Sequence, residues 1–137
     1  MKISSEEEMI NCGREFAKTV KAPQVIELIG DVGAGKTTFV RGLAEGLGIK
    51  TPVTSPSFTI SKEYAFDGGR LVHYDFYRLP DPGLMAEDLD EAISDPRAIV
   101  LVEWANSVEN ILPADTKRIE IKYNDDGTRE VTLWKCI

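Results

Sequence analysis

The chain has 137 residues, of which 42% are hydrophobic and 28% charged, and this is ordinary for a soluble globular protein with one domain over residues 1–137. Its net charge of −7 disfavours strong direct binding of nucleic acid, which relies on lysine and arginine to neutralise phosphates. No apolar stretch resembles a signal peptide or a membrane span, and two cysteines with one histidine lack the spacing of a zinc site, so we expect a cytoplasmic protein without a structural metal.

The first part of the chain predicts a helix, a buried strand and a second helix. Ser5, followed three residues later by a glutamate, is typical of a capping box at a helix start. Apolar residues then recur at helical spacing, which predicts a helix over about residues 5–20 that ends before Pro23. The apolar run Gln24–Ile29 predicts a buried strand, and the helix that follows it is expected to end near Gly48.

The rest of the chain predicts two hairpins around another buried strand. Four strands are expected in these hairpins: Phe58–Tyr64 with Arg70–Phe76, and Thr116–Tyr123 with Arg129–Trp134. Between the hairpins, apolar spacing predicts a helix over about residues 84–94 and a short helix over about 106–111. The unbroken apolar run Ala98–Val102 predicts the second buried strand.

The segment between the first buried strand and the second helix carries the clearest motif. It reads GDVGAGKT and matches G-x-x-x-x-G-K-[ST], the phosphate-binding P-loop. Glycines allow backbone angles that aim several N–H groups at one phosphate, and the following helix adds its positive end. Lys36 places a charge near the outer phosphates, Thr37 offers a hydroxyl to Mg²⁺, and Thr38 is expected near the α-phosphate. The residues expected to bind ATP here are Gly30, Asp31, Val32, Gly33, Ala34, Gly35, Lys36, Thr37 and Thr38.

Together, the motif and the predicted elements indicate the fold class. Buried strands with helices between them favour an α/β protein. We therefore expect a three-layer P-loop NTPase fold with a mixed, largely parallel central sheet and a C-terminal hairpin.

Two acids follow predicted strands and are candidates for the metal and for catalysis. A P-loop site needs a carboxylate at the end of a neighbouring strand to hold Mg²⁺. Glu103 ends the apolar run Ala98–Val102, and Asp75 ends the strand that contains Leu71–Tyr74. Either acid could hold the metal together with Thr37 or orient the attacking water. The alternative for each is a surface acid at a strand end.

Three other residues are weaker candidates. Thr54 opens the sequence TSPS after the P-loop helix, where P-loop switches carry a hydroxyl that senses the γ-phosphate. An ordinary turn is the alternative. Trp104 directly follows Glu103 and is expected either to pack near the nucleotide or to belong to the core. For His73 we favour a structural role.

The order of these motifs resembles the TsaE family, the small ATPase of bacterial tRNA threonylcarbamoyladenosine synthesis. The motifs are GDVGAGKTTF, TSPSF, HYDFYR and VEW, within about residues 5–113. The resemblance implies a P-loop α/β sheet, ATP and Mg²⁺ as cofactors, and weak ATPase activity. It also implies TsaD and TsaB as partners, which would contact the tRNA, while the nucleotide cycle of this subunit would reset their complex between turnovers.

The resemblance also implies roles for individual residues, by their position in the motifs. Lys36 and Thr37 would bind phosphate and magnesium. Asp75 and Glu103 would be the paired acids, and Thr54 would belong to a switch-like loop. The family typically has threonine at the position of Ser57, and serine keeps the hydroxyl.

Three alternatives to a partner-driven ATPase remain open from the sequence. A small-molecule kinase shares the P-loop but needs an acceptor pocket and usually an arginine-bearing lid, and no segment is rich in arginine. A GTPase would carry an Asn-Lys-x-Asp stretch, which the sequence lacks. A nucleotide-sensing interaction module differs from the ATPase only in whether hydrolysis is required.

Overall fold

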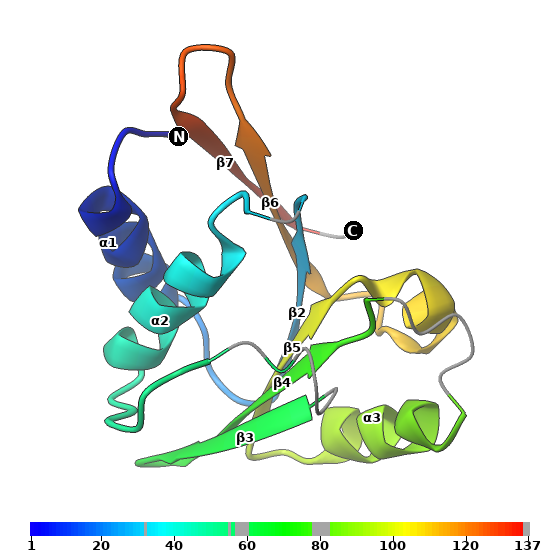
Figure 1. The fold of residues 1–137 in the computed structure, drawn as a ribbon. Coiled ribbons are helices and arrows are strands. Elements are labelled where there is room, and N and C mark those ends of the chain that lie inside the picture. Colours follow the sequence, from blue (N-terminus) through cyan, green and yellow to red (C-terminus); the bar gives the residue numbers. More distant parts are fainter. Residues whose placement is uncertain (32, 55, 57–60, 78–82, 136–137) are drawn as a thin grey trace.

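The computed structural model describes residues 1–31, 33–54, 56, 61–77 and 83–135. In this part of the chain, one seven-stranded sheet carries helices on both faces (Figure 1). The strands are β1 Lys2–Ile3, β2 Gln24–Ile29, β3 Ser61–Phe66, β4 Gly69–Asp75, β5 Ala98–Glu103, β6 Lys117–Tyr123 and β7 Arg129–Lys135. The helices are α1 Glu6–Ala17, α2 Lys36–Gly46, α3 Leu84–Ser94 and the 3₁₀ helix η1 Ala105–Ile111.

The strand order is β1-β7-β6-β2-β5-β4-β3, and the direction of pairing changes from the centre to the edges. The four central strands β6, β2, β5 and β4 are parallel. The outer strands add antiparallel, with β3 on β4, β7 on β6 and β1 on β7. The α/β class, the mixed sheet and the C-terminal hairpin are therefore confirmed, and parallel pairing is confined to the centre because both hairpins extend the edges.

Most predicted elements are confirmed, and the differences concern the end of one helix and one short strand. The predicted bounds of β2 and α3 match those observed. Ser5 is the N-cap of α1, where its hydroxyl accepts the Glu8 N–H at 3.1 Å. This helix ends at Ala17, earlier than predicted, because the Thr19 N–H and hydroxyl both bond the Phe16 carbonyl and close a turn. The predicted segment 58–60 lies outside the described residues, and the strand β1 was not predicted because two residues show no period.

Helices α1 and α2 pack closely against each other on one face of the sheet (Figure 1). A Cβ on Gly42 would lie 2.0 Å from the Ile10 carbonyl oxygen, and a Cβ on Gly13 would lie 2.3 Å from the Phe39 carbonyl oxygen. Only glycine permits so short a distance between the two backbones. Because α2 starts at the end of the P-loop, this packing fixes the position of the loop.

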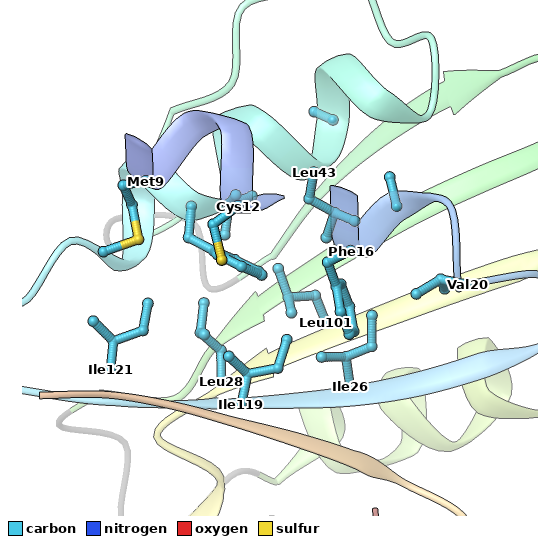
Figure 2. Close-up of a cluster of buried hydrophobic side chains, with 14 of the residues drawn as sticks. Met9, Cys12, Phe16, Val20, Ile26, Leu28, Leu43, Leu101, Ile119 and Ile121 are labelled. Carbon is cyan, nitrogen blue, oxygen red and sulfur yellow. The ribbon is translucent and has the colours of Figure 1, made fainter. Parts of the chain in front are cut away.

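The hydrophobic core has two parts, one on each face of the sheet. Under α1, the side chains of Met9, Cys12 and Phe16 point toward strand residues such as Ile26 and Ile119 (Figure 2). On the other face, α3 and η1 cover β4 and β5. The buried side chains between them include Leu89 of α3, Val108 of η1, Val72 and Tyr74 of β4, and Val100 and Val102 of β5. The sheet therefore forms the middle of three layers. Among the described residues, no helix is long and apolar enough to cross a lipid bilayer.

Candidate functional site

The P-loop lies at the carboxyl end of β2, in the centre of the sheet between β5 and β6. Gly33 and Gly35 have φ angles of +82° and +108°, a left-handed conformation that favours glycine. Gly35 is the N-cap of α2, and within the described residues no side chain caps this helix start. The uncapped N–H groups and the helix dipole make this end of α2 suitable for an anion. Of the predicted loop residues, Val32 lies outside the described part.

The loop is closed by its own backbone and presents two threonines at its exit. The Ala34 N–H donates to the Asp31 carbonyl at 3.0 Å, and the Phe39 N–H donates to the Gly35 carbonyl at 3.0 Å. In the first turn of α2, Thr37 is exposed and Thr38 is half-buried. Both hydroxyl-bearing side chains therefore remain accessible beside the helix start.

Lys36 is buried, and its ammonium group contacts a P-loop carbonyl oxygen, a carboxylate and an aromatic ring. Its side chain is 7% exposed, and Nζ donates to the Gly30 carbonyl oxygen at 2.6 Å. Nζ also lies 3.4 Å from Oε1 of Glu103 and 4.1 Å from the centre of the Trp104 ring. Since Glu103 is the last residue of β5 and Trp104 follows it, the lysine reaches from α2 across β2 toward β5.

Glu103 is a buried carboxylate with a hydrogen bond on each side. Oε2 lies 2.5 Å from Nε2 of His73, and Oε1 faces Lys36. Burial raises the pKa of Glu103, but the hydrogen bond from His73 and the charge of Lys36 outweigh it and hold this pKa below its ordinary value. The structure therefore favours a charged carboxylate at the end of β5.

His73 has a closer relation to the site than the sequence indicated. It is 1% exposed, and in the described part of the chain its Nδ1 has no hydrogen-bond partner. His73 and Asp75 are two residues apart on β4, so their side chains leave the same face of the sheet. This spacing, combined with a neighbouring strand that ends in Glu103, is the signal that could have identified the histidine.

Asp75 lies directly beside Glu103 at the ends of two parallel strands. Their Cα atoms are paired in the sheet, and Asp75 is 8% exposed. Its Oδ1 accepts the Tyr77 N–H at 2.9 Å. Burial raises the pKa of Asp75, the Tyr77 N–H lowers it, and the nearby Glu103 carboxylate raises it further, with a net shift upward. Two adjacent carboxylates are arranged so that a cation near them would lower their repulsion.

The oxygen donors near the P-loop fit Mg²⁺, although they do not form a complete ligand set. Mg²⁺ is usually bound by one or two carboxylates together with substrate phosphates and water. The hydroxyl of Thr37 and the carboxylates of Asp75 and Glu103 provide oxygen donors of this kind. Within the described residues, no group of three or more His, Cys, Asp or Glu side chains could hold a metal ion, so a Mg²⁺ ion here would need further ligands such as water.

Trp104 occupies an unusual backbone position between β5 and η1. Its φ angle of +55° is the only positive one among the described non-glycine residues. The half-buried ring lies over Lys36, and its centre is 4.7 Å from the centre of the Tyr77 ring. Such backbone angles are costly and are often kept at functional sites. The structure thus brings Trp104 to the P-loop lysine.

Thr54 is placed differently from the other candidates. Its hydroxyl accepts a hydrogen bond from the Lys62 ammonium, and its N–H donates to the Tyr64 hydroxyl at 3.3 Å. Both partners belong to β3, and in the described part of the chain Thr54 has no hydrogen bond to the P-loop. Ser57 of the same predicted loop lies outside the described residues.

The C-terminal hairpin also contacts the P-loop, which the sequence did not reveal. The Tyr123 hydroxyl donates to the Gly33 carbonyl, and Arg129 Nε donates to the Ala34 carbonyl at 3.3 Å. A tyrosine that ends a strand and an arginine that starts the next one form no recognisable motif. These contacts arise because β6 runs parallel to β2 and carries its end beside the loop.

Two hollows adjoin the loop on different sides. One of about 390 Å³ is lined by the start of α1 and by Gly33, Gly35, Thr38 and Arg129. The other, of about 440 Å³, is lined by Gly30, Trp104 and the end of β6 among others. The first includes the threonine expected near an α-phosphate.

Comparisons with known proteins agree with one another. A family model described as "Threonylcarbamoyl adenosine biosynthesis protein TsaE" matches residues 3–131. The chain is 47% identical over 119 residues to the tRNA threonylcarbamoyladenosine biosynthesis protein TsaE of Bacillus subtilis, covering 85% of this chain and 73% of that one. It is 40% identical over 135 residues to the protein of the same description from Aquifex aeolicus, covering 97% and 93%. The crystal structure of Bacillus subtilis YdiB superposes with a TM-score of 0.85 and 39% identity, covering 100% of this chain and 84% of that one.

Proposed function

The chain belongs to the TsaE family, and we propose that it is the P-loop ATPase subunit of threonylcarbamoyladenosine (t6A) synthesis on tRNA. It binds ATP with Mg²⁺, hydrolyses it slowly alone, and acts in the cytoplasm on a complex of TsaB and TsaD. The tRNA is contacted by these partners, which fits the net charge of −7 of this chain.

The observation that carries the proposal is the position of Lys36 at the uncapped start of α2. The lysine is 7% exposed and contacts a carbonyl oxygen and a carboxylate. A phosphate group at the helix start would offer this ammonium a more highly charged partner and would accept the N–H groups of the glycine-rich loop. This arrangement supports nucleotide binding more directly than the motif alone.

The hollow of about 390 Å³ suits the remainder of the nucleotide. Thr38 lines it, and this residue follows the two positions expected at the outer phosphates and the metal. A nucleotide whose α-phosphate lies at Thr38 would therefore place its ribose and base toward the start of α1. We propose this hollow, rather than the one beside Trp104, as the place of the base.

We assign the hydrolysis step to the two adjacent acids, Asp75 and Glu103. Thr37, Asp75 and Glu103 are the residues that would hold Mg²⁺, which when bound supplies positive charge to the transferring phosphate. When Lys36 turns to the phosphates, Oε1 of Glu103 becomes available for water or the metal. The lowered pKa of Glu103 keeps the carboxylate charged for either role.

We expect the rate of ATP hydrolysis to depend on a partner because of how Arg129, an arginine beside the P-loop, is already engaged. Arg129 donates to carbonyl oxygens of the loop and of the hairpin turn, so it is already engaged away from the phosphates. Many P-loop enzymes gain rate from an arginine that a partner supplies. We therefore expect low activity alone and a higher rate with TsaB and TsaD.

The test is ATP hydrolysis by the full chain with and without TsaB and TsaD of the same organism. Lys36→Ala serves as the blank, because losing a charge-assisted contact to phosphate is expected to weaken ATP binding by about 100-fold. We expect weak wild-type activity that rises several-fold with the partners. No binding to the partners and an unchanged rate would contradict the t6A assignment. ATP consumption that depends on a small acceptor would favour a kinase.

A further inference from the structure

The C-terminal hairpin holds the P-loop from the β6 side, whereas Lys36 reaches toward β5. Tyr123 is the last residue of β6 and Arg129 is the first of β7, and their Cα atoms are paired across the hairpin. Tyr123 donates to one loop carbonyl and Arg129 to the next. We refer to the side chains of Tyr123 and Arg129 together as the hairpin clip.

The hairpin clip is held together by contacts of its own. Nη2 of Arg129 donates to the Tyr123 hydroxyl at 2.7 Å, and the guanidinium carbon lies 4.1 Å from the centre of the Tyr123 ring. Nη1 of Arg129 donates to the Gly127 carbonyl at 3.2 Å. The turn is closed by the Asn124 N–H, which donates to the Thr128 carbonyl at 2.8 Å. The two side chains are thus held relative to each other by contacts that do not involve the P-loop.

The hairpin clip fixes the orientation of two consecutive peptide groups in the P-loop. In a planar trans peptide, C=O and N–H lie on opposite edges. The Gly33–Ala34 peptide is bonded on both edges, since its N–H donates to the Asp31 carbonyl at 3.0 Å. The Ala34–Gly35 peptide is bonded through its carbonyl, so the Gly35 N–H points away from the hairpin at the N-cap of α2.

We propose that the hairpin clip sets the orientation of the P-loop N–H groups for the phosphates of ATP, with Tyr123 and Arg129 as positioning residues. This inference rests on the proposed ATP binding. A loop that is already ordered loses less conformational entropy when the ligand binds, and affinity rises accordingly. The phosphates are bound in the ground state and in the transition state alike. The KM for ATP should therefore depend on the clip, while kcat should not.

The experiment compares Arg129→Gln with Lys122→Gln in the full chain. Lys122 is the neighbour of Tyr123 on β6, its side chain is 67% exposed, and it pairs with Glu120 at 3.6 Å. Each substitution replaces one positive charge with an amide. We expect the Kd and KM for ATP to rise about fivefold to tenfold in Arg129→Gln, with kcat unchanged within about twofold. Lys122→Gln should stay within about twofold of wild type.

A second measurement separates positioning from folding. Amide hydrogen exchange without ATP should become faster in the P-loop peptide of Arg129→Gln and stay unchanged in Lys122→Gln, at equal temperatures of unfolding. Equal ATP affinity in Arg129→Gln and wild type would overturn the inference and leave the proposed function intact. A fall in kcat at constant KM, with a lower unfolding temperature, would also overturn it. A wild-type chain that binds no ATP would overturn the proposed function and this inference together.

Discussion

The two sides of the P-loop are built from different kinds of interaction. On the β5 side, Lys36, Glu103 and His73 are all at most 7% exposed and interact as a buried cluster. On the β6 side, Tyr123 is 52% exposed, and the bonds run to neutral carbonyl oxygens. Charged groups in a buried site interact strongly and depend on one another, whereas hydrogen bonds near solvent contribute less each. In the proposed function, the β5 side would supply the chemistry and the β6 side the shape of the loop.

The largest effect should come from Glu103→Gln, which removes the negative charge of the buried cluster but keeps the side-chain shape. We expect kcat for ATP hydrolysis to fall by about 100-fold or more, because a positioned base or metal ligand typically contributes that much. The Kd for ATP should change by less than about threefold. Single-turnover hydrolysis and equilibrium binding with a fluorescent ATP analogue measure the two quantities.

Glu27→Gln is the matched control for this change. Glu27 is also buried, at 6% exposure, but it lies on β2 and bonds Arg118 at 2.7 Å. Its loss should leave hydrolysis unchanged within about twofold. If Glu103→Gln lost hydrolysis but kept its function in cells, nucleotide sensing without turnover would be favoured. Retained hydrolysis in this variant would contradict a catalytic role for Glu103 and leave the buried cluster structural.

A smaller effect is expected for Asp75→Asn, which tests whether Asp75 takes part in hydrolysis together with Glu103. Asp75 is the sheet partner of Glu103, and its raised pKa shows that its charge is less favoured there. We expect kcat to fall by about tenfold. A Mg²⁺ titration of both acid variants assigns the metal ligand, since the variant that needs more Mg²⁺ for half-maximal activity has lost it.

The control for Asp75→Asn is Asp88→Asn, on the opposite side of β4. Asp88 accepts the hydroxyl of Tyr74, the residue adjacent to Asp75, at 2.7 Å. Its substitution should leave the Mg²⁺ requirement unchanged. An equal loss of activity in both aspartate variants would indicate that β4 is disturbed as a whole and would contradict a specific role for Asp75.

The smallest effect concerns the hairpin clip and tests whether its two members act as one unit. Tyr123→Phe removes only the hydroxyl, and we expect it to weaken ATP binding by about twofold to threefold. Because Arg129 bonds that hydroxyl at 2.7 Å, the double variant with Arg129→Gln should lose less affinity than the sum of the single losses, by about 0.5 kcal/mol. Additive losses would show that the two side chains act separately.

Much of the fold could be predicted from the sequence because its signals are local. The apolar runs of β2 and β5 lie within a few residues and reflect burial on both faces of a sheet. The P-loop motif is equally local, and its context of strand and helix makes it specific. The placement of Glu103 at the end of β5 followed from the same pattern. The two-residue strand β1 was missed because its only signal is its distant partner, β7.

The missed contributors to the site depend on contacts between distant parts of the chain. His73 meets Glu103 across 30 residues, and the only sequence signal for this pair is the spacing of His73 and Asp75 beside a strand that ends in Glu103. Tyr123 and Arg129 reach the loop across 90 and 95 residues. For Thr54, the hydroxyl-rich loop after the P-loop helix predicts a switch-like role, which stays a prediction, and the structure gives this residue contacts with β3.

The pairing of β1 with β7 has a consequence for the order in which the newly made protein matures. Lys2 pairs with Glu130, so β1 cannot form its pairing with β7 until the chain has been synthesised to about residue 130. The glycine-rich loop emerges early, yet the arginine that holds the Ala34 carbonyl follows 95 residues later. At ordinary rates of about 5–20 residues per second, this interval lasts roughly five to twenty seconds. A nascent chain therefore carries the complete nucleotide motif for seconds before its supporting hairpin exists.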